Sequence, residues 1–115
     1  AASAFQGAGV QMERVDFLVA PTESIWTRDY GPFWVATGER RIAAVDFVYN
    51  RPRPSDDAVP AALATHLGVP AYAMPLVHTG GNYMAAGRGT SASTDLVWEE
   101  NGGDEPLVRE RMRAY

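Results

Sequence analysis

The densest group of functional side chains lies in residues 26–32, which read Trp-Thr-Arg-Asp-Tyr-Gly-Pro. The carboxylate of Asp29 can accept two parallel N–H bonds from a planar guanidinium, and the indole face of Trp26 can stack on the same cation. Binding groups concentrate on loops held by rigid strands, so this segment is a candidate binding loop. The alternative is an Arg28–Asp29 surface ion pair with Trp26 in the core, although neighbouring residues of an extended segment point in different directions.

Two arginines, Arg51 and Arg53, are each followed by a proline. Proline fixes φ and biases the preceding residue towards extended backbone, so residues 50–57 are predicted to form a stiff extended loop. Side chains two apart on such a loop face the same way. Two converging guanidinium groups suit a carboxylate or a phosphate. The alternative is that both arginines pair with Asp56 and Asp57 just downstream.

A pair of glycines stands in residues 79–83, Thr-Gly-Gly-Asn-Tyr, and residues 87–90 add Gly-Arg-Gly-Thr. Adjacent glycines allow either a close approach of the backbone to another group or a tight turn between strands. The segment is not a Walker loop, because no Gly-Lys-Ser/Thr follows. The strand predicted after it, in place of a helix, argues against a dinucleotide fingerprint.

The other reactive side chains form no pattern of a metal or nucleophile site. His66 and His78 are twelve residues apart, outside metal-ligand spacing, and for His78 a structural role is favoured over a site role. No Ser is flanked as in a nucleophile elbow. Glu99 and Glu100 are adjacent, so on a strand they would face opposite sides. The absence of Cys excludes a Cys nucleophile, a Cys-based zinc site and a disulfide within the chain, and no metal site is predicted.

Length and charge limit the remaining function classes. The chain has 115 residues, enough for one ordinary domain or part of a larger one, and a formal net charge of -4. A nucleic-acid binder needs clustered positive charge and a membrane span needs about 18–20 apolar residues in a row. Because neither is present, we expect no nucleic-acid partner and no membrane partner. Residues 1–4, Ala-Ala-Ser-Ala, resemble either a signal-cleavage scar or the edge of an excised segment.

The loops that carry these groups must be positioned by a mixed α/β framework. β-rich runs predict strands, and Pro, Gly and Asp mark the ends of helices. The predicted strands are residues 15–19, 33–36, 42–49, 69–74, 77–84 and 91–98, with 42–49 buried on both faces. The predicted helices are residues 58–67, capped by Asp56 or Asp57 and ended by Gly68, and residues 106–113. Glycine turns at 37–40 and 87–89 join two strand pairs. A ββαβ unit recurs loosely, and no linker composition divides the chain.

Three of these segments together resemble one enzyme family. Residues 26–35 resemble the Trp-x-Arg-Asp-x-Gly-Pro signature of the guanidino-group-modifying enzymes, in the branch that holds agmatine deiminases and bacterial peptidylarginine deiminases. Residues 46–54, Asp-Phe-Val-Tyr-Asn-Arg-Pro-Arg-Pro, look more like the bacterial peptidylarginine deiminases, as do residues 80–84 followed by 93–97. The resemblance covers roughly residues 14–101 in a consistent order.

The resemblance implies a fold and a reaction. The fold is the pentein α/β propeller built from ββαβ-type modules, and residues 1–115 would be a single segment from its N-terminal part, an incomplete propeller. The reaction is hydrolysis of a guanidinium to a ureido group and ammonia without metal or cofactor. In that family a Cys thiolate attacks the guanidinium carbon, a His acts as general acid and base, and two carboxylates hold the guanidinium.

The resemblance also assigns site residues. Asp29 matches the catalytic, guanidinium-binding Asp, and Trp26 matches the aromatic wall beside it. Arg51 and Arg53 match the basic pair suited to the carboxylate of a C-terminal arginine. The expected ligand is therefore an arginine-containing peptide or another guanidino small molecule.

The sequence also departs from the family pattern. It lacks the nucleophilic Cys and the His-x-Asp motif, and Thr79 and Ala86 stand where many relatives carry acidic residues. We therefore expect the substrate-binding portion of a deiminase that is inactive alone, and that either self-associates or needs the missing modules. The alternative is a non-catalytic module that binds an arginine-like or carboxylate ligand, or a partner chain that completes it. Family members are secreted or cytoplasmic, and the sequence leaves the compartment open.

Overall fold

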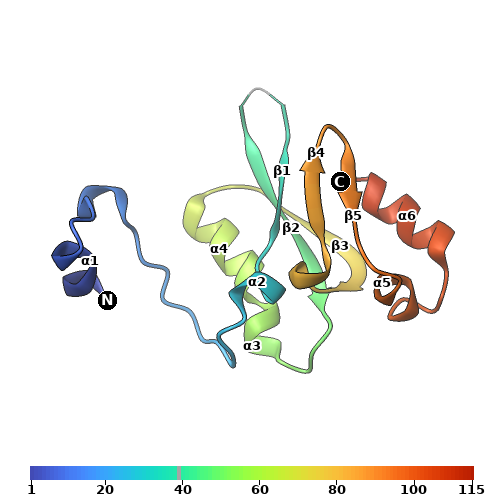
Figure 1. Ribbon diagram of the computed structural model, residues 1–115, viewed down its shortest axis with the longest axis horizontal. Coiled ribbons are helices and arrows are strands. Elements are labelled where there is room, and N and C mark those ends of the chain that lie inside the picture. The colour runs from blue at the N-terminus through green and yellow to red at the C-terminus, as the bar shows by residue number, and fades with distance from the viewer. Residues whose placement is uncertain (39) are drawn as a thin grey trace.

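A three-stranded mixed sheet forms the centre of the computed structural model, which describes residues 1–38 and 40–115 (Figure 1). Its strands are β1 (Phe33–Ala36), β2 (Ile42–Tyr49) and β3 (Ala71–His78), in the order β1-β2-β3. β1 and β2 are an antiparallel hairpin, whereas β2 and β3 are parallel and joined through helix α4 (Val59–Leu67). This ββαβ unit confirms the predicted α/β class. The predicted hairpin turn includes Glu39, which lies outside the described residues.

Strand β2 is central, and its predicted burial on both faces is confirmed only in part. One face is buried along its whole length (Ala43, Val45, Phe47, Tyr49), whereas on the other face Ala44 is buried but Ile42 and Val48 are 49% and 50% exposed. The consecutive residues Ala43, Ala44 and Val45 are all buried, although successive side chains point to opposite faces. Helix α4 packs against β2 and β3, and its Ala64 is buried as well. The small alanines allow the helix to lie close to the sheet.

Helix α4 begins and ends largely as predicted. Pro60 lies in its first turn, where no N–H is required, and Gly68 ends it in the left-handed region at φ 65°. The predicted cap is wrong: Ala58 is the N-cap residue and no side chain caps the helix. Asp56 and Asp57 instead belong to a preceding short helix, α3 (Pro54–Asp57), and their carboxylates bind other backbone groups.

The second half of the chain is less extended than predicted. After β3 come a 3-10 turn η2 (Gly80–Asn82), strands β4 (Met84–Gly87) and β5 (Thr90–Ala92), and helices α5 (Leu96–Glu99) and α6 (Glu105–Arg113). The predicted strand 77–84 is wrong because η2 interrupts it. The predicted strand 91–98 is wrong beyond residue 92, because residues 93–95 are irregular and residues 96–98 belong to helix α5. The turn at 87–89 is confirmed, with three consecutive positive φ values. Helix α6 is also confirmed, and Asp104 caps it by accepting the N–H of Leu107 at 2.9 Å.

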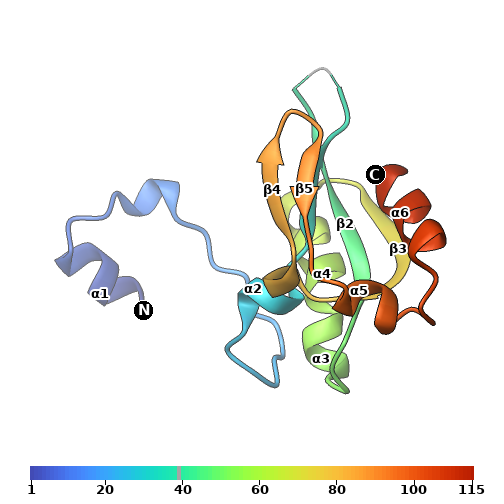
Figure 2. The same cartoon turned by 45° about the vertical axis from the view of Figure 1, so that its right-hand side comes forward.

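The N-terminal part lies apart from the sheet (Figures 1 and 2). It contains α1 (Ala2–Gly7), a 3-10 turn η1 (Met12–Arg14) and an irregular segment that leads to residue 26. The predicted strand at 15–19 is wrong, because these residues have no partner strand and leave Phe17, Leu18 and Val19 exposed. No helix in the described part of the chain is long and apolar enough to cross a bilayer.

The hydrophobic core joins the sheet to the segments that carry the site. Helices α5 and α6 contribute Val97 and Val108, and the segment before β1 contributes Tyr30. The other buried members, all from β2 and β3, are Val45, Phe47, Tyr49, Met74 and Leu76. Because Tyr30 is part of this cluster, the segment around residues 26–32 has a fixed position against the sheet.

Candidate functional site

Residues 26–32 form a helical turn where the sequence indicates a loop. Helix α2 (Thr27–Tyr30) starts at Trp26, whose carbonyl accepts the N–H of Asp29 at 2.8 Å. Gly31 returns to extended backbone and Pro32 follows, so the helix cannot continue. In this helical turn the side chains point in different directions, so that one is buried and others are accessible to solvent.

The buried member of this turn is Tyr30, and Trp26 and Asp29 remain accessible. The ring of Tyr30 contacts that of Tyr49 edge-on at 5.9 Å, and its hydroxyl donates to the carbonyl oxygen of Ser24 at 3.0 Å. Trp26 is 56% exposed, so the alternative of a core tryptophan is wrong. Asp29 is half-buried. An exposed indole three residues before a half-buried carboxylate suits the binding of a planar cation.

Arg28 does not pair with Asp29. Its Nη2 donates to the carbonyl oxygen of Tyr83 at 2.9 Å, and it forms no ion pair with a described residue. The alternative of an Arg28–Asp29 surface ion pair is therefore wrong. The arginine instead ties helix α2 to the chain that follows η2.

The glycine pair packs directly on helix α2, so the first and third sequence motifs meet (Figures 1 and 2). A Cβ on Gly80 would overlap the carbonyl oxygen of Arg28, and one on Gly81 would overlap Oδ1 of Asp29. The hydroxyl of Thr79 also donates to the carbonyl oxygen of Asp29, at 3.4 Å. Neither glycine has a positive φ, so close approach rather than turn conformation explains both of them.

The arginine motif forms a bend, so the predicted stiff extended loop over residues 50–57 is wrong. The N–H of Arg53 donates to the carbonyl oxygen of Arg51 at 2.7 Å, and the short helix α3 begins directly afterwards. Arg51 donates to the carbonyl oxygen of Asn50 at 3.2 Å. Neither arginine forms an ion pair with any residue that the structure describes, so the alternative pairing with Asp56 and Asp57 within 4.0 Å is absent there. Both guanidinium groups therefore remain available to an anion.

All three motifs gather at one edge of the sheet. The parallel strands β2 and β3 end side by side at Tyr49 and His78, and the N–H of Asn50 donates to the carbonyl oxygen of His78 at 3.1 Å. The arginine bend follows β2, the glycine pair follows β3, and α2 packs on the glycine pair. The carboxyl ends of parallel strands are where α/β proteins commonly bind ligands. The edge therefore combines an aromatic ring, a carboxylate and two guanidinium groups.

His78 supports this edge from inside the core, which confirms the structural role favoured for it. It is completely buried among the rings of Phe33, Phe47 and Tyr83, with centroids 5.4, 5.8 and 6.0 Å away. Neither ring nitrogen has a hydrogen-bond partner among the described residues. Burial lowers the pKa of His78 from 6.5 to about 4, so the ring is neutral at neutral pH. The other histidine, His66, contacts the carboxylate of Asp16 at 2.7 Å.

Sequence reasoning missed the role of Asp56. Its side chain is completely buried and accepts hydrogen bonds from the segment that leads to Trp26. Burial opposes its ionisation, but the hydrogen bonds from Ser24 and Glu23 and the charge of Arg53 outweigh burial and lower the pKa of Asp56. An Asp-Asp pair before a helix normally indicates a cap, and no local signal shows that the partner lies more than thirty residues upstream.

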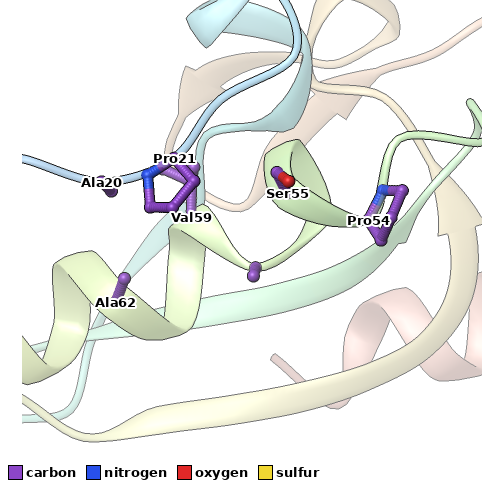
Figure 3. Close-up of a pocket in the computed structure, with 7 residues that line it drawn as sticks. Ala20, Pro21, Pro54, Ser55, Val59 and Ala62 are labelled. Carbon is purple, nitrogen blue, oxygen red and sulfur yellow. The ribbon is translucent and has the colours of Figure 1, made fainter.

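Two other features of the molecule lack the chemistry of a site. Within residues 1–38 and 40–115, no group of three His, Asp or Glu side chains could hold a metal ion. A cavity of about 330 Å³ between residues 20–21 and helices α3 and α4 is lined by alanine, proline and valine, with Ser55 as its one polar residue (Figure 3). It offers no charged group for a guanidinium or carboxylate.

Comparison with known proteins identifies relatives of this chain. The sequence model of the Porphyromonas-type peptidyl-arginine deiminase family matches residues 1–115. A Streptomyces coelicolor protein assigned to the agmatine deiminases is 34% identical over 107 residues, covering 87% of this chain and 32% of that protein. The chain therefore spans about a third of the length of that curated relative.

Solved structures share the fold. The agmatine deiminase of Enterococcus faecalis superimposes with a TM-score of 0.76 at 22% identity, over 84% of this chain and 30% of that one. The agmatine deiminase of C. jejuni gives 0.67 at 23% identity, over 96% of this chain and 35% of that one. The ββαβ unit and the turns at its edge are thus part of a fold that these enzymes contain.

Proposed function

Because the chain belongs to the Porphyromonas-type peptidyl-arginine deiminase family, we propose that it is the substrate-binding portion of a deiminase that converts arginine in peptides to citrulline and ammonia. One observation carries the proposal. The half-buried carboxylate of Asp29 is held against Gly81, three residues after an exposed Trp26.

In this proposal Asp29 and Trp26 hold the guanidinium. The carboxylate accepts two N–H bonds from adjacent guanidinium nitrogens, and the indole stacks on the planar face. Together they fix the plane of the guanidinium, so that a nucleophile can approach its central carbon from one defined side. The absence of a side chain at Gly81 leaves the carboxylate in place.

Arg51 and Arg53 are proposed to bind the carboxylate of a C-terminal arginine. Neither forms an ion pair with a described residue, and both follow Asn50, whose N–H donates to the carbonyl oxygen of His78 at the end of β3. A peptide that ends in arginine carries its guanidinium and carboxylate on one residue, so it can reach both halves of the edge.

The remaining chemistry is proposed to come from elsewhere in the family protein. The chain contains no Cys, and its two histidines are a core residue and a partner of Asp16. The thiolate that attacks the guanidinium carbon and the histidine that transfers protons would lie outside this third of the relatives' length. In that arrangement the ββαβ unit is one module of a pentein propeller, and the chain alone releases no citrulline.

Calorimetric titration with two ligands tests the proposal: a short peptide ending in arginine and the same peptide with an amidated C-terminus. Asp29→Asn is expected to weaken both ligands by at least about tenfold, because a charge-assisted bidentate contact is lost. Arg51→Gln with Arg53→Gln is expected to weaken only the free-carboxylate peptide. Asp95→Asn, an exposed carboxylate without a hydrogen-bond role in its helix cap, is the matched control.

Two results would contradict the proposal. If wild-type and Asp29→Asn protein bind both peptides with equal affinity, Asp29 does not bind the guanidinium and the proposed site is wrong. Robust citrulline release by the 115-residue chain would show that it carries its own nucleophile.

A further inference from the structure

We propose that Asp56 is a positioning residue that holds the arginine bend and the segment before Trp26 at a fixed separation, so that one ligand can span both. This inference rests on the proposed function, since it assigns the two ends of the ligand to those two segments. Asp56 lies three residues after Arg53, and its hydrogen bonds reach a segment that ends two residues before Trp26.

The carboxylate of Asp56 accepts three hydrogen bonds from the backbone and a hydroxyl group of one short segment. The N–H groups of Glu23 and Ser24 donate to Oδ1 at 2.6 and 3.2 Å, and the hydroxyl of Ser24 donates to Oδ2 at 2.6 Å. Asp56 is 0% exposed, so no water competes for these bonds. Charge-assisted bonds in a buried place are stronger than neutral ones and have defined geometry.

A second contact runs in the opposite direction. Oε2 of Glu23 accepts the N–H of Ser55 at 2.8 Å, at the start of helix α3. Each segment therefore binds the backbone or hydroxyl of the other through a carboxylate. Ser24 is also held by its carbonyl oxygen, which accepts the hydroxyl of Tyr30 at 3.0 Å. We call the four residues Glu23, Ser24, Ser55 and Asp56 the carboxylate clamp.

The other end of the clamp is fixed to the sheet and to the arginine bend. The N–H of Tyr49, the last residue of β2, donates to Oδ1 of Asp57 at 2.6 Å. The N–H of Asp57 donates to the carbonyl oxygen of Arg53 at 3.0 Å. Helix α3 is thus bonded both to the end of β2 and to the bend, and a movement of Asp56 would be transmitted to Arg53.

Apolar packing does little to hold the clamped segment. Val19 is 94% exposed and Ile25 is 85% exposed, on either side of the clamp. Where the segment crosses α3 and α4 at Ala20 and Pro21, it leaves the cavity of about 330 Å³ described above (Figure 3). The hydrogen bonds to Asp56 and Glu23 are therefore the main contacts that locate residues 20–25.

Peptide titration separates a positioning role from a merely structural one. Asp56→Asn and the milder Ser24→Ala are compared with wild-type chain, using the arginine-terminated peptide and its amide. A loosened separation is expected to weaken the free-carboxylate peptide by about tenfold and the amide by less than about twofold, because the amide engages only Trp26 and Asp29. Asp104→Ala, which removes the side-chain cap of the distant helix α6, is the control for lost stability.

A ligand-free measurement accompanies the titration. Hydrogen exchange of the amides of Glu23 and Ser24 is expected to be slow in wild-type chain and at least about tenfold faster in an Asp56→Ala variant, because both protons lose their shared acceptor, Oδ1 of Asp56. If the exchange rates of these two amides are the same in the variant and in wild-type chain, the carboxylate clamp does not hold this segment and the inference is wrong.

The titration outcomes separate this inference from the function on which it rests. If wild-type chain prefers the free-carboxylate peptide but Asp56→Asn weakens both peptides equally, the positioning role is wrong and the proposed function stands. If wild-type chain binds neither peptide, the proposed function fails, and the positioning role fails with it.

Discussion

Acidification should destabilise the fold through His78, because this imidazole is completely buried among three aromatic rings. Neither of its nitrogens has a hydrogen-bond partner in the described structure, so a proton on the ring would bring an uncompensated charge into the core. The unfolded chain exposes the same imidazole to water, where protonation is easy. The two states therefore bind different numbers of protons below neutral pH.

The pKa of His78 gives the sign and the size of this effect. Burial lowers that pKa from 6.5 to about 4 in the folded state. Between these values the unfolded state binds more protons, so the contribution is fully present above about pH 6.5 and is lost as the pH falls towards 4. At about 1.4 kcal/mol for each unit of pKa difference, the free energy of unfolding should fall by about 2 kcal/mol between pH 7.5 and pH 5.

Urea unfolding at pH 7.5, 6 and 5, followed by far-UV circular dichroism, measures this loss. His78→Phe keeps an aromatic ring in the cluster and removes the titrating group, so its free energy of unfolding should vary much less over the same range. His66→Gln, which removes the histidine beside Asp16, controls for the other imidazole. Asp46 acts in the opposite direction, since burial and the charge of Asp57 raise its pKa, and it is the same in all variants. Equal pH dependence in wild-type and His78→Phe protein would refute the reasoning.

Two further substitutions test the contacts that build the site. Gly81→Ala should weaken the binding of a guanidinium ligand by about tenfold at little cost in stability, because the new methyl group displaces only the carboxylate of Asp29. Gly80→Ala places its methyl group against the backbone of Arg28 and should lower the free energy of unfolding by about 1–3 kcal/mol. Equal losses of stability in the two variants would contradict this. Asn101→Ala should cost about 2–4 kcal/mol in urea unfolding, because the amide exchanges hydrogen bonds of 2.9 and 2.8 Å with Val77 and donates a third to α5; a loss below about 1 kcal/mol would show that water replaces these bonds.

Local patterns predicted the parts of the fold that depend on local chemistry. The strand over 42–49 follows from an apolar run, and the end of α4 follows from Gly68, whose φ of 65° suits glycine. The strand predicted at 15–19 has the same β-rich composition but no partner, so it remains irregular. Strand pairing is a long-range property, and composition alone does not show whether a partner exists.

The site was only partly predictable for the same reason. The residue types in the motif around Asp29 indicated a guanidinium ligand, and the glycine pair indicated either a turn or a close approach. Only the fold shows that the approach is to Asp29 itself. For Arg51 and Arg53 the prolines predicted an extended backbone, but the N–H of Arg53 bonds back to the carbonyl of Arg51 and produces a bend. The bend leads directly into α3, which places Asp56 where it can reach Ser24.

The position of Asp56 shows how a small site can be built from short, irregular segments. Helix α4 forms without a side-chain cap, because N–H groups at an exposed helix end can bond to water. The segment at Glu23 and Ser24 has neither a partner strand nor a buried apolar side chain, so it depends on its hydrogen bonds to Asp56. A buried carboxylate gains more by accepting three donors than it would by accepting a single helix N–H. The residue that local rules would place at a cap therefore connects the two segments that the proposed ligand must span. Under this proposal, hydrogen bonds at the sheet edge set the position of the site, whereas the sheet itself is held by the packing of its core.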